Sequence, residues 1–506
     1  MRVKFILPAM TPARSGRLRP IKYALFPPLG LGTLAGYLRD GDEIELVNEH
    51  VQRLRTDDEP ELVAMTVYPP SARRAYALAD HYRARGAHVC LGGLHVSACR
   101  DEAARHADTV FLGPGEEAWP RFLADFRAGR AGGVYRSETR SLEGVPPVRR
   151  DLLSLHRYLV PNTMVVSRGC PHACDFCYNS SFYAGGRRFY TLRVERALAE
   201  IDRLSGRHVY FLDDHLFGSR RFAEALFDGM RRMGRLWQGA ATVRSVLAPG
   251  LLEKAAEAGC RSLFVGFETL DEGNLAGVHK THSLRGDYET AVRRMHDLGV
   301  MVNGSFVFGL DGDDAGVFGR TVEWAVRMGI ETATFHVLTP YGGTALHERM
   351  AREGRIVTRN WDLYDARHAV FRPALMTAEE LEAGHRRAYR RFYRWSNVLR
   401  AAWTKAGVAG RLRHVMYTGG WRKFESAWAV LIRFGAVQRM LPVLEDVLAG
   451  FGRGAARRAP TARACPPGAG AADHAGLVTS LNRLGDDRDL RERKALWASC
   501  VSWRSS

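Results

Sequence analysis

The sequence predicts an α/β protein built from two successive parallel-sheet domains, with a helical region at its C-terminal side. Three observations indicate this class. Short apolar runs alternate with amphipathic segments through the first 130 residues, and the same alternation begins again at Thr163. A length of 506 residues is enough for two or three domains with sizeable cores.

The first alternation predicts an open sheet with helices on both faces. Helices are expected at residues 29–38, 72–85 and 117–126. Glycines stand where the carboxyl ends of the strands should lie, and this is where open parallel sheets bind ligands. The buried strands are expected at residues 3–7, 43–47, 62–67, 88–91 and 109–112.

The second alternation consists of six strand–helix units and predicts a partial β/α (TIM-like) barrel, whose active groups lie at the carboxyl ends of the strands. Its strands are expected at residues 164–167, 208–212, 240–243, 262–267, 302–308 and 332–338. Its helices are expected at residues 194–204, 221–233, 250–258, 288–298 and 317–328.

These patterns divide the chain into five parts. Residues 1–135 form the first domain, and 136–160 form a linker with little periodicity. The barrel occupies residues 161–375, and a basic helical region follows at 376–458. Residues 459–506 are rich in Ala, Gly, Pro and Arg, so we expect a disordered tail.

Cys170, Cys174 and Cys177 follow the first barrel strand with C-x3-C-x2-C spacing. Three thiolates on one short loop can bind three corners of a 4Fe–4S cluster. The fourth iron then has no protein ligand and can bind a substrate or cofactor. The spacing therefore indicates a cluster that takes part in catalysis and not only one that stores electrons.

Two other uses of these cysteines, a zinc site and disulfides, fit the sequence less well. A Cys3His zinc site would need His172, which is cramped between two of the cysteines. A disulfide framework is disfavoured because the chain has only 8 Cys in 506 residues and no signal-peptide pattern at its start. No run of about 18 apolar residues predicts a membrane span. We therefore expect a protein of a reducing compartment, the cytoplasm.

Further polar residues follow the other barrel strands. Asp213 and Asp214 come after the second strand, Glu268 ends the fourth, Gly309 follows the fifth and Tyr341 follows the sixth. Carboxylates suit ribose hydroxyls and an α-ammonium group, while glycine admits the edge of a base. Any one of these acids could instead cap a helix.

The cysteine motif, with Phe176 in its aromatic slot, resembles the radical S-adenosylmethionine (radical SAM) superfamily. The resemblance implies that S-adenosylmethionine chelates the open iron and that the reduced cluster cleaves it to a 5′-deoxyadenosyl radical. It also implies an S-adenosylmethionine site made of Phe176, Tyr178, Asp213, Asp214, Glu268, Gly309 and Tyr341.

The first domain resembles the Rossmann-like cobalamin-binding domain of one radical SAM class. The D-x-H-x-x-G motif of the axial histidine reads Asn48-x-His50-x-x-Arg53 here, so ligation by His50 lacks its orienting carboxylate. The alternative is a domain that has lost its cofactor. The resemblance implies cobalamin contacts from Leu29, Gly30, His50, Gly92, Gly93, His95, Gly113, Gly115 and Glu116.

The net charge of +18 is concentrated near the C-terminal side, where residues 386–458 hold 16 Lys/Arg against three acids. One interpretation is a solvated helical cap on the open side of the barrel. The other is a basic amphipathic surface on anionic lipid, to which an apolar stripe at residues 428–441 contributes. Nucleic acid is not expected, since no base-reading motif accompanies the charge.

The resemblance implies a cobalamin-dependent methyltransferase that acts on an unactivated carbon of a lipid or natural product. Alternatives are an oxidative cyclase or another radical oxidoreductase without methyl transfer, and a non-enzymatic iron–sulfur redox sensor. Expected partners are a small-molecule or lipid substrate and a one-electron reductant of the flavodoxin or ferredoxin type. Peripheral contact with the inner face of the membrane is a further expectation.

Overall fold

A computed structural model describes residues 1–10, 24–280, 286–423 and 437–452. The first domain contains a six-stranded sheet in which all strands are parallel and the order is β2-β1-β3-β4-β5-β6. Its strands are β1 (Arg2–Leu7), β2 (Glu43–Asn48), β3 (Leu62–Thr66), β4 (His88–Gly92), β5 (Thr109–Leu112) and β6 (Gly133–Arg136).

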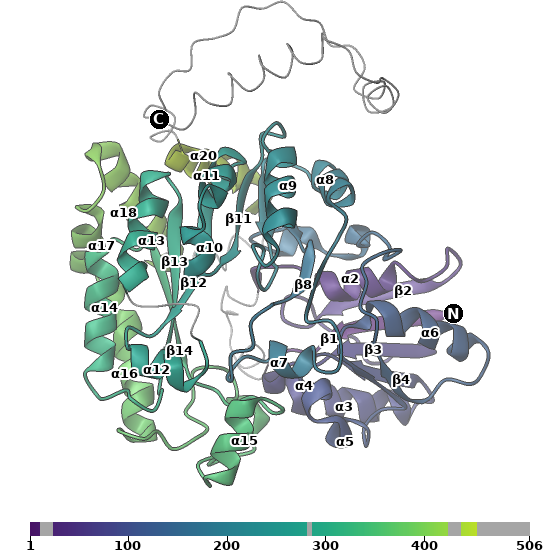
Figure 1. Cartoon of the computed structure of the whole chain (residues 1–506). Helices are drawn as coiled ribbons and strands as arrows, with labels where there is room; N and C mark the ends of the chain where they lie inside the picture. The colour runs from purple at the N-terminus through teal and green to yellow at the C-terminus, as the bar shows by residue number, and fades with distance from the viewer. Residues whose placement is uncertain (11–23, 281–285, 424–436, 453–506) are drawn as a thin grey trace, which may run out of the picture. The chain divides into compact units, whose positions relative to one another are not determined.

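Helices follow the strands as predicted, and the carboxyl ends of the strands point toward the barrel (Figure 1). The expected helices are α2 (Leu29–Ala35), α3 (Ala72–Arg83) and α6 (Gly115–Arg127). Two short helices, α4 (Leu94–Ala98) and α5 (Arg100–Ala103), follow β4 and were not predicted. The strand order reverses between β1 and β3, which is where open α/β sheets form their ligand crevice.

One strand of this sheet lies partly in the predicted linker. Strand β6 pairs with β5 at the edge of the sheet, but its residues are mostly exposed. An exposed edge strand carries no buried alternation, so periodicity could not distinguish it from a loop.

The second domain has a six-stranded parallel sheet in the order β14-β13-β12-β11-β10-β7. The prediction of six strand–helix units is confirmed. The first strand is shorter than predicted, because Ser167 belongs to a separate antiparallel ribbon of β8 (Ser167–Gly169) and β9 (Phe189–Thr191). The sheet strands are β7 (Thr163–Met164), β10 (His208–Phe211), β11 (Leu236–Ala241), β12 (Cys260–Glu268), β13 (Met301–Phe308) and β14 (Thr332–Val337).

Helices surround this sheet, and several begin at a residue whose side chain accepts the hydrogen bond of an N-cap. Ser219 caps α9 (Arg220–Met230), Thr242 caps α10 (Val243–Leu247) and Thr344 caps α15 (Ala345–Arg352). The predicted strand at residues 240–243 is displaced, because β11 begins earlier and α10 already starts at Val243. The other helices are α7 (Asn179–Phe182), α8 (Val194–Asp202), α11 (Leu251–Glu257), α12 (Glu272–Gly277), α13 (Gly286–Asp297) and α14 (Val317–Arg327).

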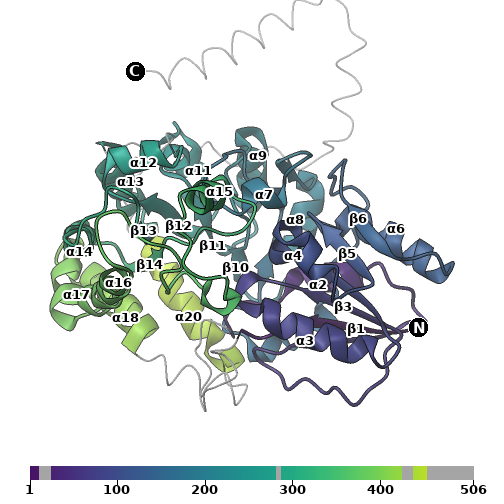
Figure 2. The same cartoon turned by 90° about the horizontal axis from the view of Figure 1, so that it is seen from below.

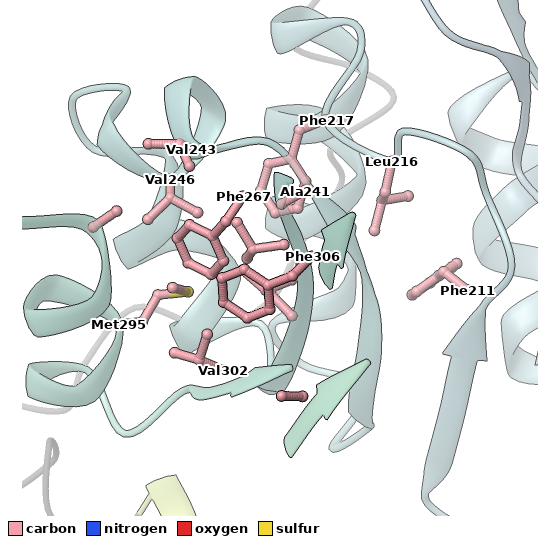
Figure 3. Close-up of a cluster of buried hydrophobic side chains, with 14 of the residues drawn as sticks. Phe211, Leu216, Phe217, Ala241, Val243, Val246, Phe267, Met295, Val302 and Phe306 are labelled. Atoms are coloured by element: carbon pink, nitrogen blue, oxygen red, sulfur yellow. The ribbon is translucent and has the colours of Figure 1, made fainter. Parts of the chain in front are cut away.

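The barrel core is rich in buried aromatic side chains. Phe267 and Phe306 stack with ring centroids 5.6 Å apart, and both are fully buried with Met295 and Val302 beside them (Figure 3). Because such a core resists rearrangement, it holds the strand ends and the loops that follow them in fixed positions.

Helix α16 (Ala378–Phe392) covers the free edge of the barrel at β14. The hydroxyl of Tyr393 accepts from the backbone N–H of Ala333 and donates to its carbonyl, and the Tyr389 hydroxyl accepts from the N–H of Phe335. Side chains thus replace the missing neighbouring strand, which removes a site of unwanted edge pairing. This arrangement agrees with the cap interpretation.

Three further helices follow: α17 (Trp395–Ala402), α18 (Gly407–Lys423) and α20 (Val437–Gly452). Lys405 forms a buried ion pair with Glu331, and the Thr418 hydroxyl donates to the Glu331 carbonyl, so both residues anchor this region to the barrel. Among the described residues no helix is long and apolar enough to cross a membrane. Most of the predicted stripe at 428–441, and the predicted disordered tail, lie outside the described residues.

Candidate active site

The cysteine loop lies between β8 and β9, at the carboxyl ends of the barrel strands. Asp213 fixes the start of this loop. Its carboxylate accepts from the backbone N–H groups of Val166 and Ser167 and from the Ser167 hydroxyl, at 2.5 to 3.1 Å. Burial raises the pKa of Asp213 to about 6. Because three donors and 3% exposure leave this carboxylate no free side, we interpret Asp213 as a positioning residue.

The three cysteines lie in a sheltered site, where Cys174 is buried and Cys170 and Cys177 are partly buried. Burial raises the pKa of Cys170 to about 11 and that of Cys177 to about 12, and the charge of Cys174 contributes to both increases. Disulfides are absent from the described part of the chain, so these thiols are available as ligands. The donor set fits an iron–sulfur cluster, which binds cysteine thiolates.

The geometry does not favour the zinc alternative. Across the described residues, one set of three His, Cys or carboxylate ligand atoms lies within 4.8 Å, and it is formed by His95, Cys99 and Glu102. The cysteine loop with His172 is not such a set. The His172 ring instead lies 5.5 Å from the ring of His215, which follows Asp214. Thiols spaced more widely than tetrahedral ligands suit the larger cluster better.

Asp214 faces the opposite way from Asp213 and lines a cavity. The Tyr178 hydroxyl, one residue after Cys177, donates to its carboxylate at 2.8 Å. Burial raises the pKa of Asp214, and its charge contributes to the raised pKa of both Cys170 and Cys177. The structure therefore brings Tyr178 and Asp214 together beside the cysteine loop.

Glu268 ends β12 at an irregularity in the pairing with β13, and its φ of +64° is unusual for a residue with a side chain. The Lys280 ammonium donates to the Glu268 carboxylate at 2.5 Å and to the Gly266 carbonyl at 2.9 Å. Lys280 is 5% exposed, and its positive charge opposes the rise in pKa of Cys170 and Cys174. A carboxylate and an ammonium thus lie beside the cysteine loop.

A cavity of about 330 Å³ lies between the carboxyl ends of the first sheet and the cysteine side of the barrel. Tyr178, Asp214 and Arg168 contribute from the barrel side. Seven of the nine predicted cobalamin residues contribute from the first domain: Leu29, Gly30, Gly92, Gly93, Gly113, Gly115 and Glu116.

Two features of the cavity wall suit a large ligand with amide and phosphate groups. An added Cβ at Gly30 would meet nothing within 4 Å, so a side chain there would extend into open space. Arg150 also lines the cavity, so its wall includes a positively charged hydrogen-bond donor group. The wall therefore fits cobalamin, whose periphery carries acceptors for such a donor.

The two predicted histidines do not line this cavity. His50 Nδ1 lies 3.0 Å from Asn48 Oδ1, and His50 Nε2 accepts from the N–H of Met10 at 3.2 Å. His95 is buried against the Tyr76 hydroxyl, which lies 2.9 Å from its Nε2. In the His95–Cys99–Glu102 group, Glu102 accepts from Trp361 Nε1, so both His95 and Glu102 already have protein partners. We assign neither histidine to cobalt.

Three predicted residues lie at the edge of the site. Phe176 packs against the barrel core, and Gly309 follows β13 with a φ of +99°. An added Cβ at Gly309 would lie 2.8 Å from Leu381, so packing alone explains this glycine. Tyr341 follows β14, and burial raises its pKa to about 12. Phe176 stands next to Cys177 in the cysteine loop, whereas Gly309 and Tyr341 follow other barrel strands.

Sequence reasoning missed three positively charged residues. Lys280 pairs with Glu268, and Arg168 Nε donates to Glu116 at 2.6 Å across the cavity. Arg140 is 2% exposed and donates to the carbonyls of Tyr183 and Ala184, just after α7. Arg168 could have been noticed because it stands two residues before Cys170, whereas the other two carry no recognisable pattern.

The fold and site define an enzyme that places an iron–sulfur centre and a second large cofactor around one cavity. The model of the Radical SAM superfamily matches residues 164–325, and that of the B12 binding domain matches residues 23–123. The chain belongs to the radical SAM superfamily, in its class with an N-terminal cobalamin-binding domain. Its cofactors are a 4Fe–4S cluster, S-adenosylmethionine and cobalamin.

Relatives of this chain include proteins named as methyltransferases and as cyclases. The bacteriochlorophyllide d C-12(1)-methyltransferase of Chlorobaculum tepidum is 28% identical over 353 residues, covering 67% of this chain and 76% of that protein. The hopanoid C-2 methylase of Rhodopseudomonas palustris is 29% identical over 354 residues, covering 66% of each. The solved structure of the methyltransferase TsrM from Kitasatospora setae, with cobalamin and a [4Fe-4S] cluster, has a TM-score of 0.57 at 16% identity, covering 87% of this chain and 99% of that one.

Proposed function

We propose that this enzyme transfers a methyl group to an unactivated carbon of a bulky apolar substrate, a lipid or a natural product. The observation that carries the proposal is the shared cavity, where Tyr178 and Asp214 from the barrel face Gly30 and Gly92 from the first domain. The relatives named for bacteriochlorophyllide and hopanoids support an apolar polycyclic substrate class.

The bound cofactors supply a carbon-centred radical and a transferable methyl group, and the protein supplies geometry and exclusion of water. Cys170, Cys174 and Cys177 hold the cluster. Asp214 accepts the Tyr178 hydroxyl at 2.8 Å, which fixes the direction of both side chains toward the cavity.

The Glu268–Lys280 pair is suited to the zwitterionic end of S-adenosylmethionine. Glu268 offers an acceptor for an ammonium, and Lys280 offers donors for a carboxylate. Because both groups are nearly buried, such contacts are little screened by solvent. This assignment places the amino acid end of the cofactor beside the cysteines, where a chelating ligand of the open iron belongs.

We infer that the enzyme works in the cytoplasm, because the cluster and its thiolates need a reducing environment. An external one-electron donor of the flavodoxin or ferredoxin type completes the reaction. Peripheral membrane contact is considered separately below.

The test uses the full chain, purified without oxygen and supplied with iron, sulfide and hydroxocobalamin. On chemical reduction with S-adenosylmethionine it should form 5′-deoxyadenosine, and Cys174→Ala should form none. Cys99→Ala is the matched control and should retain the product. Absence of the product from the wild type at full iron content would favour a redox sensor and contradict the proposal.

A further inference from the structure

Helices α17 and α18 present a concentrated apolar surface to solvent. Six of the ten exposed large hydrophobic residues in the described part of the chain belong to these helices or the residues that end them. Trp403 is 67% exposed and Val408 79% exposed. We call this surface the α17–α18 face: Trp395, Leu399, Trp403, Val408, Leu412 and Met416.

The six residues form two adjacent stripes. Trp395, Leu399 and Trp403 recur every four residues along α17, and the other three recur every four residues along α18. The Trp395 ring lies against Gly419 at one end of the pair, where an added Cβ would be 2.9 Å away. The Arg411 guanidinium lies over the Trp403 ring at 4.1 Å at the other end. The helices are therefore antiparallel, and their stripes run alongside each other.

This face is not explained by burial inside the domain. The opposite side of α17 already buries Val398, Ala401 and Ala402 against the barrel. On α18, His414 and Thr418 point inward while Leu412 and Met416 remain exposed. An exposed patch of this kind on a folded protein marks an interaction surface.

The surroundings of the face are strongly basic. Residues 386–420 contain nine Lys/Arg and no Asp/Glu. A hollow of about 610 Å³ at the start of α14 adjoins the face and is lined by Arg387, Arg390, Arg391 and Arg394. Arg391 lies 3.8 Å from Glu323, but in the described part of the chain no carboxylate pairs with the other three.

We propose that the α17–α18 face and this arginine hollow dock the protein on an anionic lipid bilayer. Tryptophan, leucine and methionine side chains insert at the level of the headgroups, while the arginines bind lipid phosphates. A second copy of the chain fits poorly, because two such faces would bring their unpaired arginines together. The stripes also lie on convex helix surfaces, which offer no groove for a partner helix.

Docking here leaves the cofactor cavity accessible. Both views place α17 and α18 on the side of the barrel away from the first sheet, which forms one wall of the cavity (Figures 1 and 2). The proposal is therefore independent of the proposed function, and its test measures binding alone.

The test is co-sedimentation of the full chain with vesicles of phosphatidylcholine, alone or mixed with phosphatidylglycerol. Binding should require the anionic lipid and should weaken with added salt. Two triple variants should each lose about tenfold or more in vesicle affinity: Leu399→Ser/Trp403→Ser/Leu412→Ser and Arg387→Gln/Arg390→Gln/Arg394→Gln.

Matched controls make the test specific to this face. Val357→Ser/Leu375→Ser removes two comparably exposed apolar residues elsewhere. Arg203→Gln/Arg221→Gln/Arg232→Gln removes equal charge from α9 and from the turns that follow α8 and α9. Both controls should bind like the wild type. Equal binding by all variants, or no binding by the wild type, overturns the proposal. So does a dimer in solution that only the α17–α18 variants convert to monomer, since the face would then be a self-association interface.

Discussion

Arg168 and Glu116 form an ion pair of 2.6 Å that joins the two cofactor-binding domains. Glu116 lies in the first turn of α6, at the carboxyl end of the first sheet, and Arg168 stands two residues before Cys170. Both side chains are at most 19% exposed, and both line the shared cavity. The pair therefore couples the position of the cysteine loop to the cobalamin side of the cavity.

Replacing Arg168 alone should lower the free energy of unfolding more than replacing both members of the ion pair. Arg168→Met leaves a buried carboxylate without its partner, which typically costs about 3 kcal/mol of stability. Arg168→Met/Glu116→Gln should recover part of this loss. A double-mutant cycle by urea unfolding measures the coupling, and additive single losses would show that the pair contributes nothing.

Substitutions at the neighbouring residues Asp213 and Asp214 should affect stability, iron content and product formation in different ways. Asp213→Leu removes the acceptor of three hydrogen bonds that hold Val166 and Ser167, so it should lower the unfolding midpoint and the iron content together. Asp214→Asn should keep both and reduce 5′-deoxyadenosine formation by about tenfold or more. Similar behaviour of the two variants would contradict the division of roles.

Gly30→Phe should fill the cavity mouth without strain, because no atom lies within 4 Å of an added Cβ. The variant should bind cobalamin at least about tenfold more weakly while its iron content is unchanged. Gly41→Phe is the matched control, since an added Cβ there also meets nothing within 4 Å and Gly41 is outside the cavity. Titration with cobalamin, followed by absorbance, measures the affinity of each variant. Equal cobalamin affinities of Gly30→Phe and Gly41→Phe would show that cobalamin binds elsewhere.

His208 makes stability depend on pH. Burial lowers its pKa to about 4 in the folded protein, against about 6.5 in the unfolded chain. As the pH falls from about 6.5 to about 4, the unfolded state takes up the proton first, so the free energy of unfolding falls by at most about 3 kcal/mol. Above this window the contribution is constant. Urea unfolding at several pH values should show that the free energy of unfolding falls less in His208→Leu than in the wild type. Parallel plots of this free energy against pH would contradict the prediction.

Much of the fold was predictable because each strand is a local apolar run. The glycines that line the first-domain wall of the cavity lie directly after these strands, so their position could also be predicted. The cysteine motif likewise lies within one short stretch of sequence. The exposed edge strand β6 gave no such signal.

The missing parts of the site depend on contacts between distant segments. Glu116 and Arg168 are 52 residues apart, and only the packing of two domains brings them together. Lys280 follows α12, well after Glu268, and reaches it only because the chain folds back over β12. Asp213 and Asp214 are alike in sequence, and only the structure shows which one faces the cavity.

Methyl transfer through cobalamin can be tested by following a deuterated methyl group. The fully loaded enzyme is reduced with S-adenosylmethionine labelled in its methyl group, and the cobalamin and nucleoside products are analysed by mass spectrometry. A cobalamin-dependent methyltransferase should give 5′-deoxyadenosine together with deuterated methyl on the recovered cobalamin. Deoxyadenosine from protein that retains no cobalamin, or that transfers no label to it, would contradict methyl transfer and leave a radical enzyme of the cyclase kind.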